Sequence, residues 1–175
     1  MMTSIPDTAL PEPGSRSHDA DGRLVGLHFD SQQPPAPGGH IWLIAIDGSQ
    51  PSRLAVAEAI RLAGESRDCR LHLVHVQPWM SREAADSELA RRGWAASQAA
   101  REALATAGLP WRLHVAMGEA AESIVRIASE QGCRGIVVGS RGLGTAANLL
   151  IGSVATKVIH LSPLPVLVAG RLTAR

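Results

Sequence analysis

From residue 40 onward, short apolar runs alternate with segments of helical spacing, and this alternation limits the possible folds more than any other feature. The intervening segments repeat apolar residues every three or four positions, as Val56, Ala59 and Ala63 do. The apolar runs span residues 41–46, 71–76, 111–117, 136–138 and 165–169. Strands that alternate with helices in this way form an open sheet with helices on both faces. We therefore expect an α/β fold with a five-stranded parallel sheet of order 3-2-1-4-5.

The helical segments differ in length. Residues 82–107 are rich in alanine and predict one long helix that ends at Gly108 and Pro110. A shorter helix is predicted around Ile124, and another over 154–161, before Ser162-Pro163.

Composition limits the partners. The chain has 175 residues and a net charge of +1 without basic runs, so we expect one domain that binds neither nucleic acid nor an anionic membrane surface. No apolar stretch approaches the roughly 20 residues of a membrane span, and no leader pattern is visible. Cys69 and Cys133 are far apart and fit free thiols in a reducing compartment. A cytoplasmic location is the expectation.

The first 39 residues differ from the rest of the chain. They contain six prolines with scattered Gly, Ser and Asp, a composition typical of chains that cannot bury enough apolar surface to fold. Only 24–27 and Phe29 could pack. We expect residues 1–39 to be a largely disordered extension with one short docking piece, residues 40–170 to be the domain, and 171–175 a tail.

A spaced glycine motif follows the fourth apolar run. It reads Gly139-Ser140-Arg141-Gly142, then nine residues, then Gly152-Ser153, just before the helix-like run at 154–161. Glycine lets the backbone approach an anion closely, and the free N–H groups and dipole of a helix start stabilise its charge. The motif therefore predicts a phosphate site.

Asp47 predicts the opposite wall of that site. It follows the first predicted strand as Gly139 follows the fourth, and these two strands are neighbours in the expected order. Open α/β sheets bind ligands where the strand order reverses, beyond the C-terminal strand ends. No lysine follows Gly152, so the loop is not a P-loop, which favours binding over rapid hydrolysis.

The chain resembles the universal stress protein family in several separated motifs. The spacing G-x2-G-x9-G-[ST] is that family's ATP-binding signature. Residues 41–49 resemble its opening strand and DGS turn, 73–76 its second strand, and 163–168 its closing strand. The resemblance covers about residues 40–170 and implies a Rossmann-like, adenine nucleotide alpha hydrolase-like fold.

The resemblance implies roles for matching positions. Asp47 would lie beside the ribose or a metal ion, and Val76 and Val138 would flank the adenine. The ligand would be ATP, or AMP or ADP, with Mg²⁺ or Mn²⁺ arriving with the nucleotide. A homodimer would form through the last strand, Pro165 to Ala169. The nucleotide-binding residues would be Ile46, Asp47, Val76, Val138, Gly139, Ser140, Arg141, Gly142, Gly152, Ser153 and Val154.

Structural interpretations compete with these roles. The glycines could serve only the strand–loop–helix connection, and Asp47 could be a helix-capping turn residue. His75 fits a buried core histidine. His72 and His75 lie three residues apart on a predicted strand. Their side chains therefore face opposite sides of the sheet and cannot bind one metal ion together. No Ser/His/Asp order or CxxC motif indicates catalysis.

Three functions therefore remain open. The first is a nucleotide-dependent regulatory switch in stress response, with at most slow ATP hydrolysis or autophosphorylation. The second is a slow ATPase or adenylyl-transferring enzyme of related fold. The third is a nucleotide-independent dimeric interaction module that docks through its N-terminal extension. The protein client is unknown.

Overall fold

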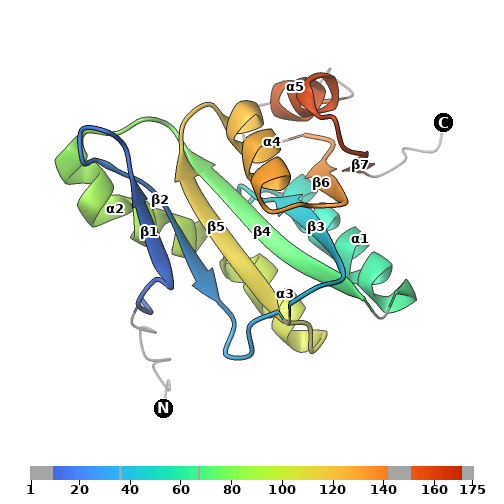
Figure 1. Cartoon of the computed structure of the whole chain (residues 1–175). Helices are drawn as coiled ribbons and strands as arrows, with labels where there is room; N and C mark the ends of the chain where they lie inside the picture. Colours follow the sequence, from blue (N-terminus) through green and yellow to red (C-terminus); the bar gives the residue numbers. More distant parts are fainter. Residues whose placement is uncertain (1–9, 36, 67, 142–150, 171–175) are drawn as a thin grey trace, which may run out of the picture.

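The computed structural model describes residues 10–35, 37–66, 68–141 and 151–170 (Figure 1). These residues form one sheet with helices on both faces. In chain order the elements are β1 (Ser15–His18), β2 (Leu24–Asp30), β3 (His40–Ala45), α1 (Gln50–Glu65), β4 (Cys69–Gln77), α2 (Arg82–Ala96), α3 (Gln98–Thr106), β5 (Trp111–Met117), α4 (Ala120–Glu130), β6 (Gly135–Gly139), α5 (Ser153–Leu161) and β7 (Val166–Ala169).

The sheet has seven strands in the order β1-β2-β5-β4-β3-β6-β7. The predicted five-stranded sheet is thus wrong in strand number and in overall order. The strands from β5 to β7 are parallel and follow one another as β5-β4-β3-β6-β7, whereas β2 pairs antiparallel with β5 and β1 antiparallel with β2. The two added strands come from the segment that composition alone predicts to be largely disordered.

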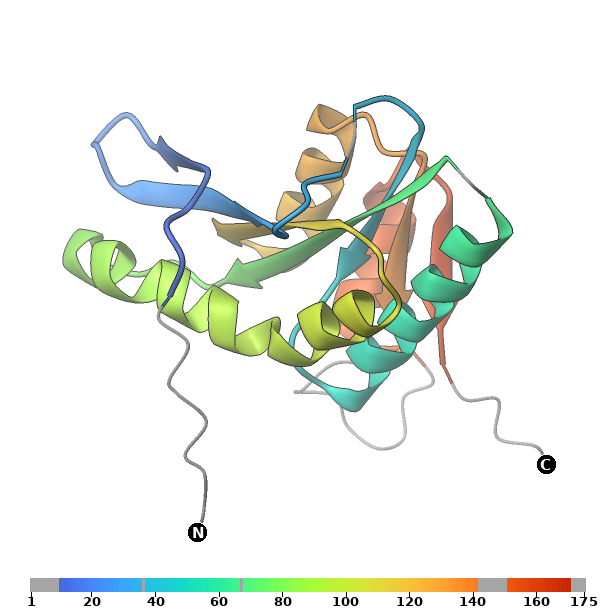
Figure 2. The ribbon, with the colours of Figure 1, turned by 90° about the horizontal axis from the view of Figure 1, so that it is seen from below.

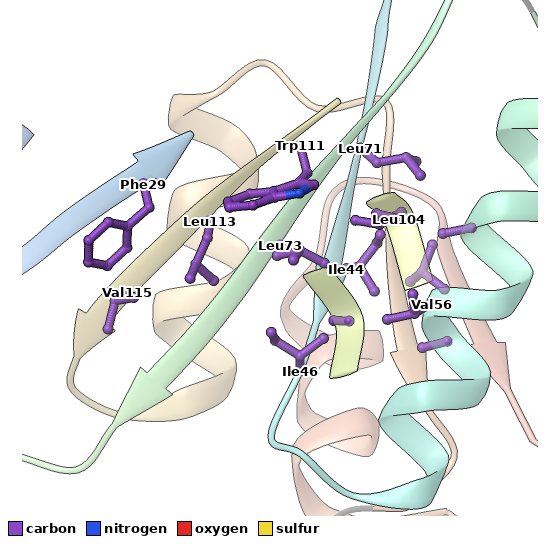
Figure 3. Packing of buried hydrophobic residues seen from close by; sticks show 14 of the residues in the cluster. Phe29, Ile44, Ile46, Val56, Leu71, Leu73, Leu104, Trp111, Leu113 and Val115 are labelled. Carbon is purple, nitrogen blue, oxygen red and sulfur yellow. The ribbon is translucent and has the colours of Figure 1, made fainter. Parts of the chain in front are cut away.

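The β1–β2 hairpin is held by three buried apolar residues. Leu24, Leu27 and Phe29 are buried, and the Phe29 ring lies 5.0 Å from the ring of Trp94 in α2. The close packing of Phe29, Leu113 and Val115 is visible in Figure 3. A few well-spaced apolar side chains thus dock a segment whose proline-rich surroundings predict disorder. Burying such side chains contributes about 1.5–3 kcal/mol each.

Helices cover the two faces of the sheet unequally. Figure 2 shows α1, α2 and α3 on one face and α4 on the other. The first face carries the larger core cluster, which includes Ile44, Leu73 and Leu113. The second face carries a cluster that α4 and α5 complete with Ile124 and Val158. Beside β1 and β2, a groove on this side is lined by both polar and apolar residues, among them Ser17, His28 and Val25.

The single helix predicted over 82–107 is wrong, because Ser97 divides it into α2 and α3. Ser97 is fully buried, and its hydroxyl donates to the Trp94 carbonyl and accepts from Arg101 Nε, both at 3.0 Å. Serine side chains that bond nearby backbone groups compete with helical hydrogen bonding. The Arg101 guanidinium also lies 3.4 Å from the centre of the Trp94 ring, which fixes the break against the core.

Among the described residues, no helix has both the length and the apolar character needed to cross a membrane.

Candidate functional site

A cavity of about 360 Å³ lies beyond the C-terminal ends of β3 and β6, against the starts of α4 and α5. Most of the sequence-predicted binding residues line it: Ile46, Asp47, Val76, Val138, Gly139, Arg141, Gly152, Ser153 and Val154. Ser140 does not line it. Gly142 lies outside the described residues. The topology therefore brings together groups that are separated by about 90 residues in the chain.

Asp47 forms one wall through a tight turn. The ladder of β3 with β4 ends after Ile46, whose N–H donates to the Val74 carbonyl at 2.9 Å. Asp47 then accepts from the Ser49 N–H at 2.9 Å, and Gly48 adopts a φ of 82° that favours glycine. Ser49 caps α1 by accepting from Ser52 N–H at 3.2 Å. Asp47 is thus a turn residue that also lines the cavity, so the two interpretations are compatible.

The deeper wall of the cavity is apolar. Val74 and Val76 lie two apart on β4 and share a face, and Val138 of β6 and Ile124 of α4 complete the wall. Val74 and Val138 are almost fully buried. A wall of this kind suits a flat apolar ring rather than a charged group.

Gly139 has a packing role that the motif alone does not reveal. A Cβ at this position would lie 2.6 Å from the carbonyl carbon and oxygen of Pro51 in the first turn of α1. That approach is shorter than real Cβ contacts allow. Gly139 therefore permits β6 and α1 to meet beside the cavity, whatever the cavity binds.

The N-terminus of α5 faces the cavity without a side-chain cap. Gly152 is its N-cap residue and makes no side-chain cap bond, while its own N–H donates to the Ser140 carbonyl at 2.7 Å. Residues Gly152, Ser153 and Val154 line the cavity at this point. The first N–H groups of a helix have no partner within the helix and, with the helix dipole, favour an anion.

Few charges line the cavity. Of the described lining residues, Asp47 and Arg141 carry the formal charges, and Arg141 is exposed. At its rim, Glu119 caps α4 by accepting from Glu122 N–H at 3.0 Å and also contacts Lys157 of α5 at 3.2 Å. That pair ties the start of α4 to α5.

His75 supports the Asp47 turn from the other face of the sheet. It is buried, with Nδ1 2.9 Å from the Ile46 carbonyl, so Nδ1 carries the hydrogen and donates. Its Nε2 then accepts from the Gln77 amide at 2.5 Å. Burial lowers the pKa of His75 and keeps the ring neutral, although the Ile46 bond and Asp47 act in the opposite direction. This matches the core-histidine interpretation.

The motifs did not single out several lining residues. Val74 could have been found because it alternates with Val76, whereas Ile124 and Ser52 enter through the packing of α4 and α1. Within the described ranges, no group of three or more His, Cys, Asp or Glu side chains is arranged to hold a metal ion.

Comparisons with known sequences agree on one family. A model described as the universal stress protein family matches residues 40–170. The chain is 34% identical over 146 residues to the universal stress protein YxiE of Bacillus subtilis (strain 168), covering 72% of this chain and 95% of that protein. It is 33% identical over 130 residues to a universal stress protein of Thermus aquaticus, and this match covers 71% of this chain and 94% of that protein.

Solved structures share the fold. The hypothetical protein MJ0577 superposes with a TM-score of 0.63 at 25% identity, covering 77% of this chain and 97% of that one. A universal stress protein in complex with cAMP superposes with a TM-score of 0.53 at 25% identity, and the match covers 75% of this chain and 96% of that one. A universal stress protein from Archaeoglobus fulgidus in complex with dAMP superposes with a TM-score of 0.57 at 23% identity, and the match covers 77% of this chain and 100% of that one. At this identity the likeness shows the fold alone.

Proposed function

Because the chain belongs to the universal stress protein family, we propose that it binds an adenine nucleotide in the cavity beyond β3 and β6. We further propose that the nucleotide acts as a regulatory switch in stress response. A structural relative at 25% identity is in complex with cAMP, which supports this class of ligand.

One observation carries the proposal: an apolar slot and an uncapped helix start open into the same cavity. The slot between Val76 and Val138 suits the adenine ring, and the N–H groups from Gly152 onward suit phosphate. Asp47 on the facing wall suits a ribose hydroxyl. The volume of about 360 Å³ falls among small-molecule sites.

A divalent ion would arrive with ATP. Mg²⁺ and Mn²⁺ prefer oxygen ligands, and Mg²⁺ is often held by one or two carboxylates together with substrate phosphates. Asp47 is the carboxylate of the cavity lining that could contribute. The described lining contains no histidine or lysine that could activate water or assist a leaving phosphate. We therefore propose a binding protein that hydrolyses ATP slowly if at all.

We also propose a homodimer through β7. This strand lies at one edge of the sheet, where its outer backbone groups are available for pairing with a second copy. The neighbouring α5 exposes Val154, Ile159 and Leu161, which would be covered in such a dimer. Cys69 and Cys133 are free thiols, which fits a reducing cytoplasm.

Binding can be tested with Ser153→Asp. Ser153 is exposed at the start of α5, where a carboxylate favours the helix but repels phosphate. By isothermal titration calorimetry, we expect the wild type to bind ATP with Mg²⁺, AMP or cAMP, and Ser153→Asp to bind at least about 10-fold more weakly.

The control is Thr156→Asp, which adds the same charge to an exposed position of α5 outside the cavity lining. It should retain most of the affinity. A wild type that binds none of the three nucleotides, or a Ser153→Asp variant that binds as well as Thr156→Asp, would contradict the proposed site.

A further inference from the structure

A polar cluster joins the N-terminal hairpin to the parallel sheet. His28 and Asp30 of β2, Arg112 and His114 of β5, and His72 of β4 lie on the α4 face of three neighbouring strands. The register places His28 opposite His114 and Asp30 opposite Arg112. These residues are far apart in the chain, so the cluster exists only when β2 is docked.

The cluster is closely packed. Arg112 donates two hydrogen bonds to Asp30, at 2.7 and 2.9 Å. His72 Nδ1 lies 3.1 Å from His114 Nε2, so one ring donates to the other. His28 Nε2 lies 3.7 Å from Asp30 Oδ2. Protonation of both His72 and His114 would leave two donors and two charges facing each other.

Acidic side chains also line the groove around the cluster, namely Asp19, Glu119, Glu122 and Glu130, and Asp30 is the described carboxylate that contacts the cluster directly. Arg112 and Arg70 already act on His72, against the carboxylate of Asp30, which Arg112 engages on both oxygens. Helix α4 faces the cluster across the groove. Its charged side chains are Glu122, Arg126 and Glu130, and Arg126 is paired with Glu130. Ser15 of β1 contributes only a hydroxyl to His28, at 2.6 Å.

Burial therefore favours neutral histidines. Burial, followed by the charge of Arg112, lowers the pKa of His72 to about 4 and lowers that of His28. Burial, followed by the neighbouring His72, lowers the pKa of His114 to about 3. Release of β2 would expose these rings to water and raise the pKa of each toward the ordinary value of about 6.5, while Arg112 and Arg70 would stay beside His72. The released state binds more protons, so docking is strongest above about pH 6.5 and weakens as the pH falls below it.

The hairpin lies outside the part of the chain that the family shares. The family model matches residues 40–170, which leaves β1 and β2 outside the shared domain. The superposition with MJ0577 includes 97% of that chain but only 77% of this one. The parallel strands and the helices that cover them therefore form the shared domain without β1 and β2.

We propose that the β1–β2 hairpin is an acid-released clasp: protonation of His28, His72 and His114 detaches it and opens the edge of β5. The released edge of β5 lies apart from the proposed nucleotide cavity and from β7.

Hydrogen exchange on the full chain tests the clasp. Exchange would be followed by mass spectrometry at pH 7.5 and 5.5 and corrected for the intrinsic pH dependence of amides. With two histidines whose pKa lies far below 6.5 in the docked state, exchange of β2 and of the β5 amides that face β2 should increase by up to about 100-fold, while β3, β6 and the β5 amides that face β4 stay protected. An unchanged β2, or equal loss of protection in β3 and β6, would overturn the proposal.

Two variants move the response in opposite directions. His114→Asn removes one titrating ring and should reduce the increase to about 10-fold. Asp30→Asn removes the carboxylate and should shift release to higher pH. His160→Asn, an exposed histidine of α5 outside the cluster, is the control and should behave as wild type. If Asp30→Asn and His114→Asn both release at the wild-type pH, the cluster is not the sensor.

Discussion

The helix α4 has a different kind of hollow on each side. Toward β3 and β6 lies the cavity of about 360 Å³, with an apolar wall and few charges. Toward β5 and the hairpin lies a groove of about 920 Å³ that includes His28, Arg112 and His114. The first is made by parallel strand ends and helix starts, which the family shares. The second lies between β5 and α4, which belong to the family match, and the β1–β2 hairpin, which lies outside it.

This difference indicates a division of roles. The parallel half, residues 40–170, lines its cavity with residues at the ends of buried strands and at helix starts, which suits the proposed binding. The hairpin half, β1 and β2, joins the sheet through apolar packing, the ladder with β5 and titratable side chains, so we expect its stability to depend on pH. Changes in one half should therefore leave the property of the other half nearly intact.

The largest effect is expected from Phe29→Ala. Phe29 is almost fully buried between β5 and Trp94, and removal of such a side chain costs about 3–5 kcal/mol. Urea unfolding followed by circular dichroism, together with exchange at β2, should show the loss in the hairpin half. Nucleotide affinity should change by less than about twofold, or about 0.4 kcal/mol. A large loss of affinity would mean that the two halves are not separable.

A smaller effect is expected from Gly139→Ala. The new Cβ meets the Pro51 backbone at 2.6 Å, and overpacking of this kind costs about 1–3 kcal/mol. Because α1 must shift beside the cavity, nucleotide affinity should fall as well, while exchange at β2 stays unchanged. Thermal unfolding and calorimetry measure the two effects.

The matched control, Gly64→Ala, has the smallest effect. A Cβ at Gly64 meets no atom within 4 Å, and the residue lies inside α1. Alanine should stabilise the helix by about 0.4–1 kcal/mol without changing nucleotide binding. If both glycine variants behave alike in unfolding, the close contact of Gly139 with Pro51 is not the cause.

The sequence predicts the parallel half better than the added half. Buried strands and amphipathic helices leave a clear periodicity, and Asp47 and Gly139 could be assigned to one crevice because parallel strands end at a common edge. The sequence indicates that Phe29 and Leu27 can pack, but nothing local shows that their segment extends the sheet. The break at Ser97 depends on a buried side chain that binds the backbone.

The histidine cluster is the hardest feature to predict. His28, His72 and His114 come from three strands, and only the antiparallel docking of β2 places His28 beside the other two. A search for ligand spacing along the chain therefore misses it. Tertiary pairing of distant strands decides this part of the molecule.

Nucleotide binding in the parallel half is tested most directly by a nuclear magnetic resonance titration of the ¹⁵N-labelled full chain with ATP and Mg²⁺ at pH 7.5. We expect the amides of Asp47, Val138 and Ser153 to shift on binding, while those of His28 and His114 do not. No shifts at the first group, or shifts centred on the histidine groove, would contradict it.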